Sequence, residues 1–318
     1  MMLLGQGAPY ERVLRQARSL QLHHGIRIEG PRGVGKSTAA LEIAAALLCT
    51  SADTAQACGA CEACARVASG AHPDVHHVGV AEDRQDISVE QVRAVQAALE
   101  RHAFEGRARV VVFDPADRLS EQGQNALLKT LEEPGDHAFL VLVTARPAGL
   151  LDTVRSRTIG VRVRPLAAEA LTAALSDQGV GAAENRPAAI SLARGSFGVA
   201  QQLLEGDLLQ LHQQIVALLD GRADMSAVSL ARQLLVGAES RKHAEARARL
   251  VLWAVRSELS QRWQALASSH EGTYCAAGFA SWADVADTLL EAEADLDQRI
   301  GAEQALCTAF LRIGERSA

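Results

Sequence analysis

Eight residues near the N-terminus have the types and spacing of a phosphate-binding loop. The run Gly30-Pro31-Arg32-Gly33-Val34-Gly35-Lys36-Ser37 matches the pattern G-x-x-x-x-G-K-[ST] at every fixed position. Such a loop surrounds phosphate with backbone N–H groups at a helix N-terminus, while its lysine reaches the β- and γ-phosphates and its serine holds Mg²⁺. The alternative is a turn that caps a helix and binds nothing. We predict that ATP or ADP with Mg²⁺ binds at Gly30, Gly33, Gly35, Lys36, Ser37 and Thr38.

Four cysteines follow the loop with the spacing C-x8-C-x2-C-x2-C, at Cys49, Cys58, Cys61 and Cys64. In a reducing cytosol, closely spaced thiols of this kind bind zinc rather than form disulfides. Four thiolates complete a tetrahedral shell and leave no position open for a substrate. The alternative, four small buried hydrophobic residues, is disfavoured by two consecutive C-x2-C steps. The spacing therefore predicts a structural Zn²⁺ site.

Composition narrows the class of protein. The chain has 318 residues, which is enough for two or three domains, and a formal net charge of −6. The acidic balance disfavours bulk electrostatic capture of nucleic acid, and an aromatic content of 3% disfavours an extended base-stacking surface. No run of 18 apolar residues occurs, and the N-terminus lacks the basic start and long apolar stretch of a secretion signal. We expect a cytoplasmic protein with no membrane partner.

Apolar runs alternate with helix-forming segments through the first 165 residues. This alternation predicts an α/β fold with a parallel sheet covered on both faces. Ser88 is expected to cap a helix, because Gln91 follows it at the third position of a capping box. The other expected helices are residues 10–20, 38–48, 121–132 and 150–154, and the expected strands are residues 25–29, 75–80, 110–114, 139–144 and 159–163.

The pattern changes after Pro165, where no further β-rich run occurs. Short helices are expected at residues 167–177, 187–192 and 199–204, and longer helices from residue 208 onward. We predict three domains. They are a phosphate-loop α/β domain at residues 1–165 with the cysteine module at 49–64, a small helical domain at 166–207 and a helical bundle at 208–318.

Two polar residues at strand ends are candidates for the same nucleotide site. Asp114 ends a run of apolar residues, and its carboxylate would orient a water molecule on Mg²⁺. Thr144 ends the next predicted strand, where a polar residue often senses the γ-phosphate. A threonine at a strand end is equally common without any function, so both interpretations of Thr144 stay open.

Three further segments carry a resemblance to a known family. They are residues 114–119 (DPADRL), 125–134 (NALLKTLEEP) and 154–157 (VRSR). Together with the phosphate loop and the four cysteines, they resemble the bacterial clamp-loader subunits of the AAA+ class. The resemblance covers residues 1–165, whereas the rest of the chain is similar in length and helicity only. It implies an AAA+ sheet domain with a zinc insertion, a small helical lid and a helical collar that mediates oligomerisation.

The sequence departs from the active ATPases of this family at two positions. A glutamate that polarises the attacking water usually follows the acidic residue of the strand, whereas here Asp114 is followed by Pro115, which cannot accept a proton. Asp117 lies nearby but projects differently. The family's motor subunits also carry an arginine in a Gly-Ser-x-Arg element, where this chain has Gly198. These departures predict nucleotide binding without hydrolysis.

The resemblance implies that Arg157 acts as an arginine finger in the ATP site of a neighbouring subunit. A planar guanidinium with several donors neutralises the charge that develops on the γ-phosphate. The alternative is a solvated arginine in a cluster with Arg155, Arg162 and Arg164. Thr158 stands where the family usually has cysteine, which is a small change.

The resemblance also implies the partners and the role. It predicts a stator in a heteropentamer with motor subunits and a delta-like subunit, which meets the sliding clamp and primed DNA through the complex. The nucleotidyltransferase activity would reside in the DNA-directed DNA polymerase holoenzyme. The alternatives are an autonomous AAA+ ATPase motor, disfavoured by Pro115 and Gly198, and a module that holds primed DNA, disfavoured by the acidic composition.

Overall fold

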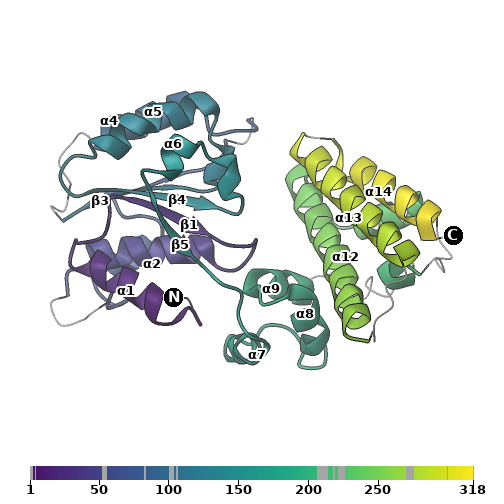
Figure 1. Ribbon diagram of the computed structural model, residues 1–318. Helices are drawn as coiled ribbons and strands as arrows, with labels where there is room; N and C mark the ends of the chain where they lie inside the picture. Colours follow the sequence, from purple (N-terminus) through teal and green to yellow (C-terminus); the bar gives the residue numbers. More distant parts are fainter. Residues whose placement is uncertain are drawn as a thin grey trace. The chain divides into compact units, whose positions relative to one another are not determined.

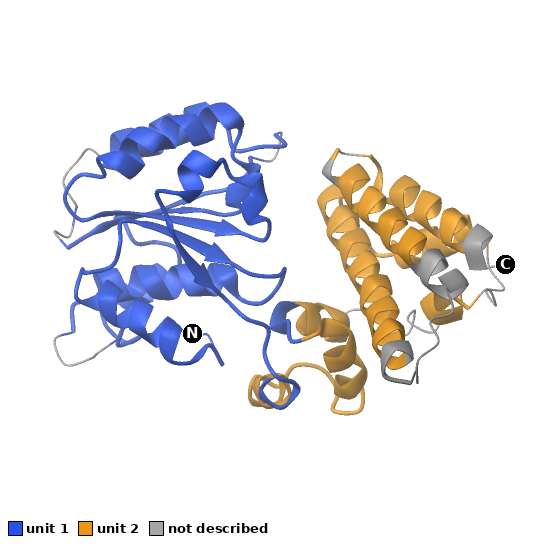
Figure 2. Ribbon diagram, viewed as in Figure 1, with its two compact units in different colours: residues 1–170, 195–198 blue, residues 171–194, 199–318 orange. Residues whose placement is uncertain are grey.

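The computed structural model (Figure 1) describes residues 3, 5–51, 56–81, 84–99, 104, 107–205, 214–217, 219–220, 226–269, 276–298 and 300–317. The chain forms two compact units (Figure 2). Unit 1 contains residues 1–170 together with the short segment 195–198, and unit 2 contains residues 171–194 and 199–318. The segment 195–198 therefore belongs to the unit from which it is distant in sequence.

Unit 1 is built on a five-stranded parallel sheet with the order β2-β3-β4-β1-β5. Strands β3 and β4 are buried along their whole length, because they lie inside the sheet and helices cover both faces. The predicted parallel α/β sheet is confirmed. The strands are β1 (Gly25–Glu29), β2 (Val75–Val78), β3 (Arg109–Phe113), β4 (Ala138–Thr144) and β5 (Ile159–Arg162).

Two helical layers enclose this sheet (Figure 1). Helices α1 (Gly7–Arg18) and α2 (Lys36–Leu48) cover one face, and α4 (Val89–Leu99), α5 (Glu121–Glu132) and α6 (Asp152–Arg155) cover the other. Side chains alternate between the faces, so the two helical layers pack on two separate cores. In β3, for example, Val110 and Val112 belong to one core and Val111 and Phe113 to the other.

Local sequence signals explain where several of these helices begin. The Ser88 N–H donates to Gln91 Oε1 at 3.0 Å, and the Gln91 N–H donates to Ser88 Oγ at 3.4 Å, which confirms the predicted capping box at α4. Ser120 caps α5 by accepting the Gly123 N–H at 3.1 Å. The largest differences from the prediction in unit 1 are that α1 begins at Gly7 rather than at Tyr10 and that an unpredicted helix α3 (Glu62–Ala68) follows Cys61.

The described part of unit 2 is helical, as the sequence predicts beyond Pro165. Its helices are α7 (Ala168–Asp177), α8 (Arg186–Ala193), α9 (Phe197–Glu205), α11 (Ala227–Leu234), α12 (Arg241–Ser269), α13 (Ala276–Asp297) and α14 (Ala302–Ser317), of which α7 and α9 begin in unit 1. The division of this region into two domains stays a prediction, and its boundary at residues 207–208 lies outside the described residues. Within the described ranges, no helix is both long and apolar enough to cross a membrane.

Candidate functional site

The phosphate loop connects β1 to α2, as the sequence predicts. Gly35 is the residue before α2 and has a left-handed backbone with φ of 95°. A side chain is strained in that conformation, so glycine is needed where the loop turns into the helix. Gly33 is left-handed as well, with φ of 73°. Gly30 lies so close to the residue after β5 that an added Cβ would be 2.4 Å from the Val163 carbonyl oxygen. Thr38 lies half-buried in the first turn of α2.

The loop brings its lysine and serine to the acidic residue predicted for the same site. The Ser37 hydroxyl donates to Asp114 Oδ2 at 2.5 Å, and Lys36 Nζ donates to the Pro31 carbonyl at 2.7 Å. Burial lowers the pKa of the Lys36 ammonium, while the carboxylates of Asp114 and Asp117 act in the opposite direction. A hydroxyl and a carboxylate in contact at a helix N-terminus fit a hydrated Mg²⁺ with phosphate oxygens.

Asp117 is held by contacts that occupy both of its carboxylate oxygens. Thr144 Oγ1 donates to Asp117 Oδ1 at 2.8 Å, and Arg146 Nε donates to Asp117 Oδ2 at 3.1 Å. The Arg146 backbone N–H in turn donates to Thr144 Oγ1 at 2.9 Å, and only 8% of the Asp117 side chain is exposed. An ion-paired carboxylate with both oxygens engaged is a poor replacement for a general base beside Pro115.

Gly198 lies directly on the phosphate loop. Its backbone N–H donates to the Gly33 carbonyl at 3.1 Å, and a Cβ on Gly198 would lie 3.3 Å from the same oxygen. The close approach is easiest for glycine, so the position that carries arginine in related motor subunits serves here for backbone contact. This contact and the hydrogen bond from the Leu166 N–H to the Gly195 carbonyl both tie residues 195–198 to unit 1.

Arg157 lies near the amino ends of the parallel strands β1 and β5, whereas the phosphate loop lies at the carboxyl end of β1. It follows α6 and precedes β5, and its carbonyl oxygen would be 3.0 Å from a Cβ on Gly25 at the start of β1. The loop follows the end of β1, and five residues of strand span about 16 Å. Arg157 Nη2 contacts Glu132 Oε1 at 2.6 Å, Nη1 donates to the Thr153 carbonyl at 3.1 Å, and 38% of the side chain is exposed. The role of Arg157 stays a prediction.

The four predicted cysteines come together between α2 and α3. Their sulfur atoms all lie within 4.8 Å of one another, and Cys61 Sγ is 3.9 Å from Cys49 Sγ. Sulfur ligands of a tetrahedral zinc are about 3.8 Å apart, given a Zn–S distance of about 2.3 Å. The backbone N–H groups of Ala60 and Cys61 donate to Cys58 Sγ and lower the pKa of that thiol. A cluster of this geometry is compatible with structural zinc.

Sequence reasoning did not select three residues that the structure places beside the predicted ones. Arg146 pairs with Asp117, Glu132 pairs with Arg157, and Arg27 of β1 donates to residues on both sides of Arg157. Arg27 had a detectable signal, because it is a charged residue between two isoleucines in a strand expected to be covered on both faces. The other two are ordinary surface charges in sequence and become recognisable only through their partners.

Comparisons with known proteins agree with these features. Residues 5–167 match a family model described as "DNA polymerase III, delta subunit". The DNA polymerase III subunit delta' of Pseudomonas aeruginosa is 35% identical over 198 residues, which cover 61% of this chain and 59% of the relative. The subunit delta' of Escherichia coli is 31% identical over 206 residues, covering 65% and 62% respectively. The chain thus spans about three fifths of the length of these two relatives.

A solved structure shares the fold. It is a DNA polymerase III gamma subunit-related protein from Thermotoga maritima, with a TM-score of 0.50 and 16% identity, covering 96% of this chain and 99% of that one. The segments that resemble clamp-loader subunits lie within the residues that match the family model. The phosphate loop, all four clustered cysteines and Arg157 lie within that match. The chain belongs to the DNA polymerase III delta subunit family.

Proposed function

We propose that this chain is a delta-prime-like stator subunit of the DNA polymerase III clamp loader. In this role it helps load the sliding clamp on primed DNA and supplies Arg157 to the ATP site of a neighbouring motor subunit. The observation that carries the proposal is the position of Arg157. Its side chain is half-exposed near the amino ends of the strands, whereas the chain's own phosphate loop lies at the carboxyl end of β1. From that end of the sheet, the guanidinium can reach a nucleotide bound to a neighbouring chain but not a nucleotide bound to the phosphate loop of its own chain.

Three features support a stator over a motor. Pro115 occupies the position of the usual catalytic glutamate, and both oxygens of Asp117 are engaged by Thr144 and Arg146. Gly198 provides a backbone N–H where motors carry an arginine. The Ser37–Asp114 contact favours the second candidate, an active AAA+ motor, because it preserves a Mg²⁺-binding pair. The stator is the better fit because neither Pro115 nor the ion-paired Asp117 can act as a general base for the attacking water.

The proposal includes two bound groups. A structural zinc would be held by Cys49, Cys58, Cys61 and Cys64, and it would fix the end of α2 against α3. ATP or ADP with Mg²⁺ would be held by the loop from Gly30 to Ser37 together with Asp114. The partners would be motor subunits and a delta-like subunit in a heteropentamer, with polymerase activity residing in the holoenzyme.

The test is Arg157→Ala in a clamp loader reconstituted with its motor subunits. We expect the variant to fold and assemble, because a half-exposed arginine contributes little to stability. An arginine finger contributes about 10³–10⁵ in rate at the site that it serves. Clamp- and DNA-stimulated ATP hydrolysis should therefore fall, while other sites of the ring continue to turn over.

The control is Arg186→Ala. It removes an arginine of unit 2 that contacts Ser176 and the backbone of its own loop. Unchanged hydrolysis and clamp loading in the Arg157 variant would remove Arg157 from the mechanism.

A further inference from the structure

Arg27 is an unusual residue for its place in the fold. It lies in β1, next to the edge strand β5 of the sheet, and only 13% of its side chain is exposed. A buried guanidinium is costly unless it is paired and hydrogen-bonded. Its cross-strand neighbour in β5 is Gly160, where an added Cβ would lie 3.3 Å from Arg27 Nη2. The strand pair thus leaves space above Gly160 for this side chain.

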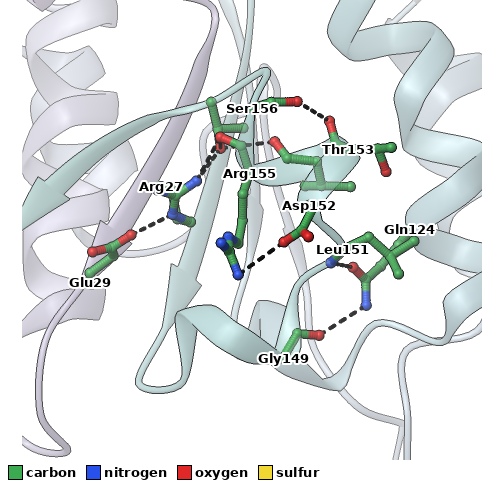
Figure 3. Close-up of polar contacts among 11 residues, drawn as sticks. Arg27, Glu29, Gln124, Gly149, Leu151, Asp152, Thr153, Arg155 and Ser156 are labelled. Carbon is green, nitrogen blue, oxygen red and sulfur yellow. Dashed lines mark hydrogen bonds and ion pairs between the residues drawn. The ribbon is translucent and has the colours of Figure 1, made fainter.

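The guanidinium of Arg27 holds the chain on both sides of Arg157. Arg27 Nη1 donates to the Arg155 carbonyl at 3.0 Å, and Nε donates to Glu29 Oε1 at 2.5 Å (Figure 3). Arg27 Nη1 also donates to Thr158 Oγ1 at 2.7 Å. Thr158 Oγ1 in turn donates to the Val154 carbonyl at 3.0 Å. The two contacts of Nη1 therefore fix the turn from which the Arg157 side chain projects.

A second anchor holds the start of the same segment. Gln124 of α5 is buried, with 4% of its surface exposed. Its Oε1 accepts the Leu151 N–H at 2.7 Å, and its Nε2 donates to the Gly149 carbonyl at 3.3 Å (Figure 3). The segment from Gly149 to Thr158 is therefore fastened to α5 at one end and to β1 at the other. Arg27 is the anchor adjacent to Arg157.

We propose that Arg27 is a positioning residue for Arg157. The two hydrogen bonds from Arg27 Nη1, to Arg155 and to Thr158, hold the α6–β5 turn in the geometry that a neighbouring nucleotide site requires. The inference rests on the proposed role of Arg157 as an arginine finger. The physical reason is that a charge acts on a transition state only when it is placed precisely, and a displacement of about 1 Å can cost about 10²-fold in rate. Supporting groups that lock the backbone of a reactive side chain supply that precision.

The experiment compares five variants in the reconstituted clamp loader: Arg27→Met, Thr158→Val, Arg157→Ala, the double variant Arg27→Met/Arg157→Ala and Arg109→Met. The measured quantity is the Arg157-dependent rate, which is the stimulated ATPase rate minus the rate of the Arg157→Ala complex. Arg109→Met is the matched control, because Arg109 is also a buried strand arginine that donates to a backbone carbonyl, that of Asp136 at 2.9 Å. Thermal unfolding of each chain measures the loss of stability separately.

We expect Arg27→Met to lower the Arg157-dependent rate about tenfold through kcat, with the KM for ATP unchanged, because the turn is displaced and the nucleotide is not. The double variant should be no slower than Arg157→Ala, because both changes act through one guanidinium. Arg109→Met should keep the wild-type rate. Thr158→Val removes one Arg27 contact together with the Thr158 bond to the Val154 carbonyl, but it keeps the Arg27 bonds to Arg155 and Glu29. It should therefore give a smaller loss in the same direction even if Arg27→Met fails to fold.

Three outcomes would overturn the inference while leaving the role of Arg157 intact. They are an unchanged rate in both Arg27→Met and Thr158→Val, a loss that multiplies in the double variant, and an equal loss in Arg109→Met. If Arg157→Ala itself left hydrolysis unchanged, the proposed finger would fail first and the inference about Arg27 would fail with it. The two failures are therefore distinguishable in a single set of measurements.

Discussion

At the scale of single residues, we propose that the chain keeps the groups that bind a nucleotide and has no general base at the position where hydrolysis needs one. Ser37 and Asp114 remain in contact, and Lys36 is held within its own loop by the Pro31 carbonyl. Pro115 offers no base for the attacking water. Because binding and hydrolysis use different residues, the first can persist without the second.

We predict that the isolated chain binds ADP or ATP and that Lys36→Ala abolishes this binding, because the ammonium and its phosphate contact are lost together. Isothermal titration of the purified chain with ADP and Mg²⁺ measures the effect. Lys129→Ala is the control, because Lys129 is an exposed lysine of α5. A robust steady-state ATPase that disappears in Lys36→Ala would contradict the stator and support the motor.

At the scale of elements, short signals predicted the strands and helices but not how they associate. The continuous apolar runs of β3 and β4 and the capping box at Ser88 were sufficient to predict these elements. The strand order was not predictable, because a fully apolar strand pairs equally well with any neighbour. Helix α3 was missed because it has only seven residues and begins inside the cysteine spacing, where metal binding dominates the sequence pattern.

The candidate site was predictable to a similar extent. Ser37 meets Asp114 and the four cysteines cluster as expected, because the loop and the cysteines are motifs with fixed spacing and Asp114 follows a buried strand. The hydrogen bond from Gly198 to Gly33 was not predictable, since it joins backbone groups that are distant in sequence. The contacts of Arg27 also depend on strand order, which places β1 beside β5.

We predict about one zinc per chain, bound between α2 and α3. Structural zinc sites contribute apparent free energies of about 10–16 kcal/mol in small peptides near neutral pH. Chelation or Cys61→Ser should therefore remove the metal and lower the melting temperature, as measured by elemental analysis and thermal unfolding. Cys307→Ser is the control, because Cys307 lies in α14 of unit 2 and is not a member of the cluster. Substoichiometric metal together with four rapidly reacting thiols would refute the site.

At the scale of the whole molecule, unit 1 is completed by a segment that follows α8 in sequence. Gly195 has φ of +81°, and an added Cβ would lie 2.4 Å from the Leu166 carbonyl oxygen. The Leu166 N–H donates to the Gly195 carbonyl at 2.8 Å. The segment can approach Leu166 this closely because residue 195 is glycine, which has no Cβ that would clash with the Leu166 carbonyl oxygen.

We predict that Gly195→Ala destabilises unit 1 by more than the strain of its backbone alone. A left-handed alanine costs about 1–2 kcal/mol, and here the backbone must also shift away from Leu166. Gly237→Ala is the matched control, because Gly237 has φ of +84° and no heavy atom within 4 Å of an added Cβ. Hydrogen exchange should accelerate at the Gly198 amide and the phosphate loop in Gly195→Ala but not in Gly237→Ala. Equal effects of the two substitutions would contradict this prediction.

The return of residues 195–198 to unit 1 limits how this protein can be dissected. The chain passes between the two units after residues 170, 194 and 198, so no single cut separates them. A fragment that stops at residue 170 would keep every residue of the phosphate loop and lose the amide that meets the Gly33 carbonyl. A phosphate-loop module excised at that point would be an incomplete copy of the one in the intact chain, and transplanting it into another protein would require the later segment as well.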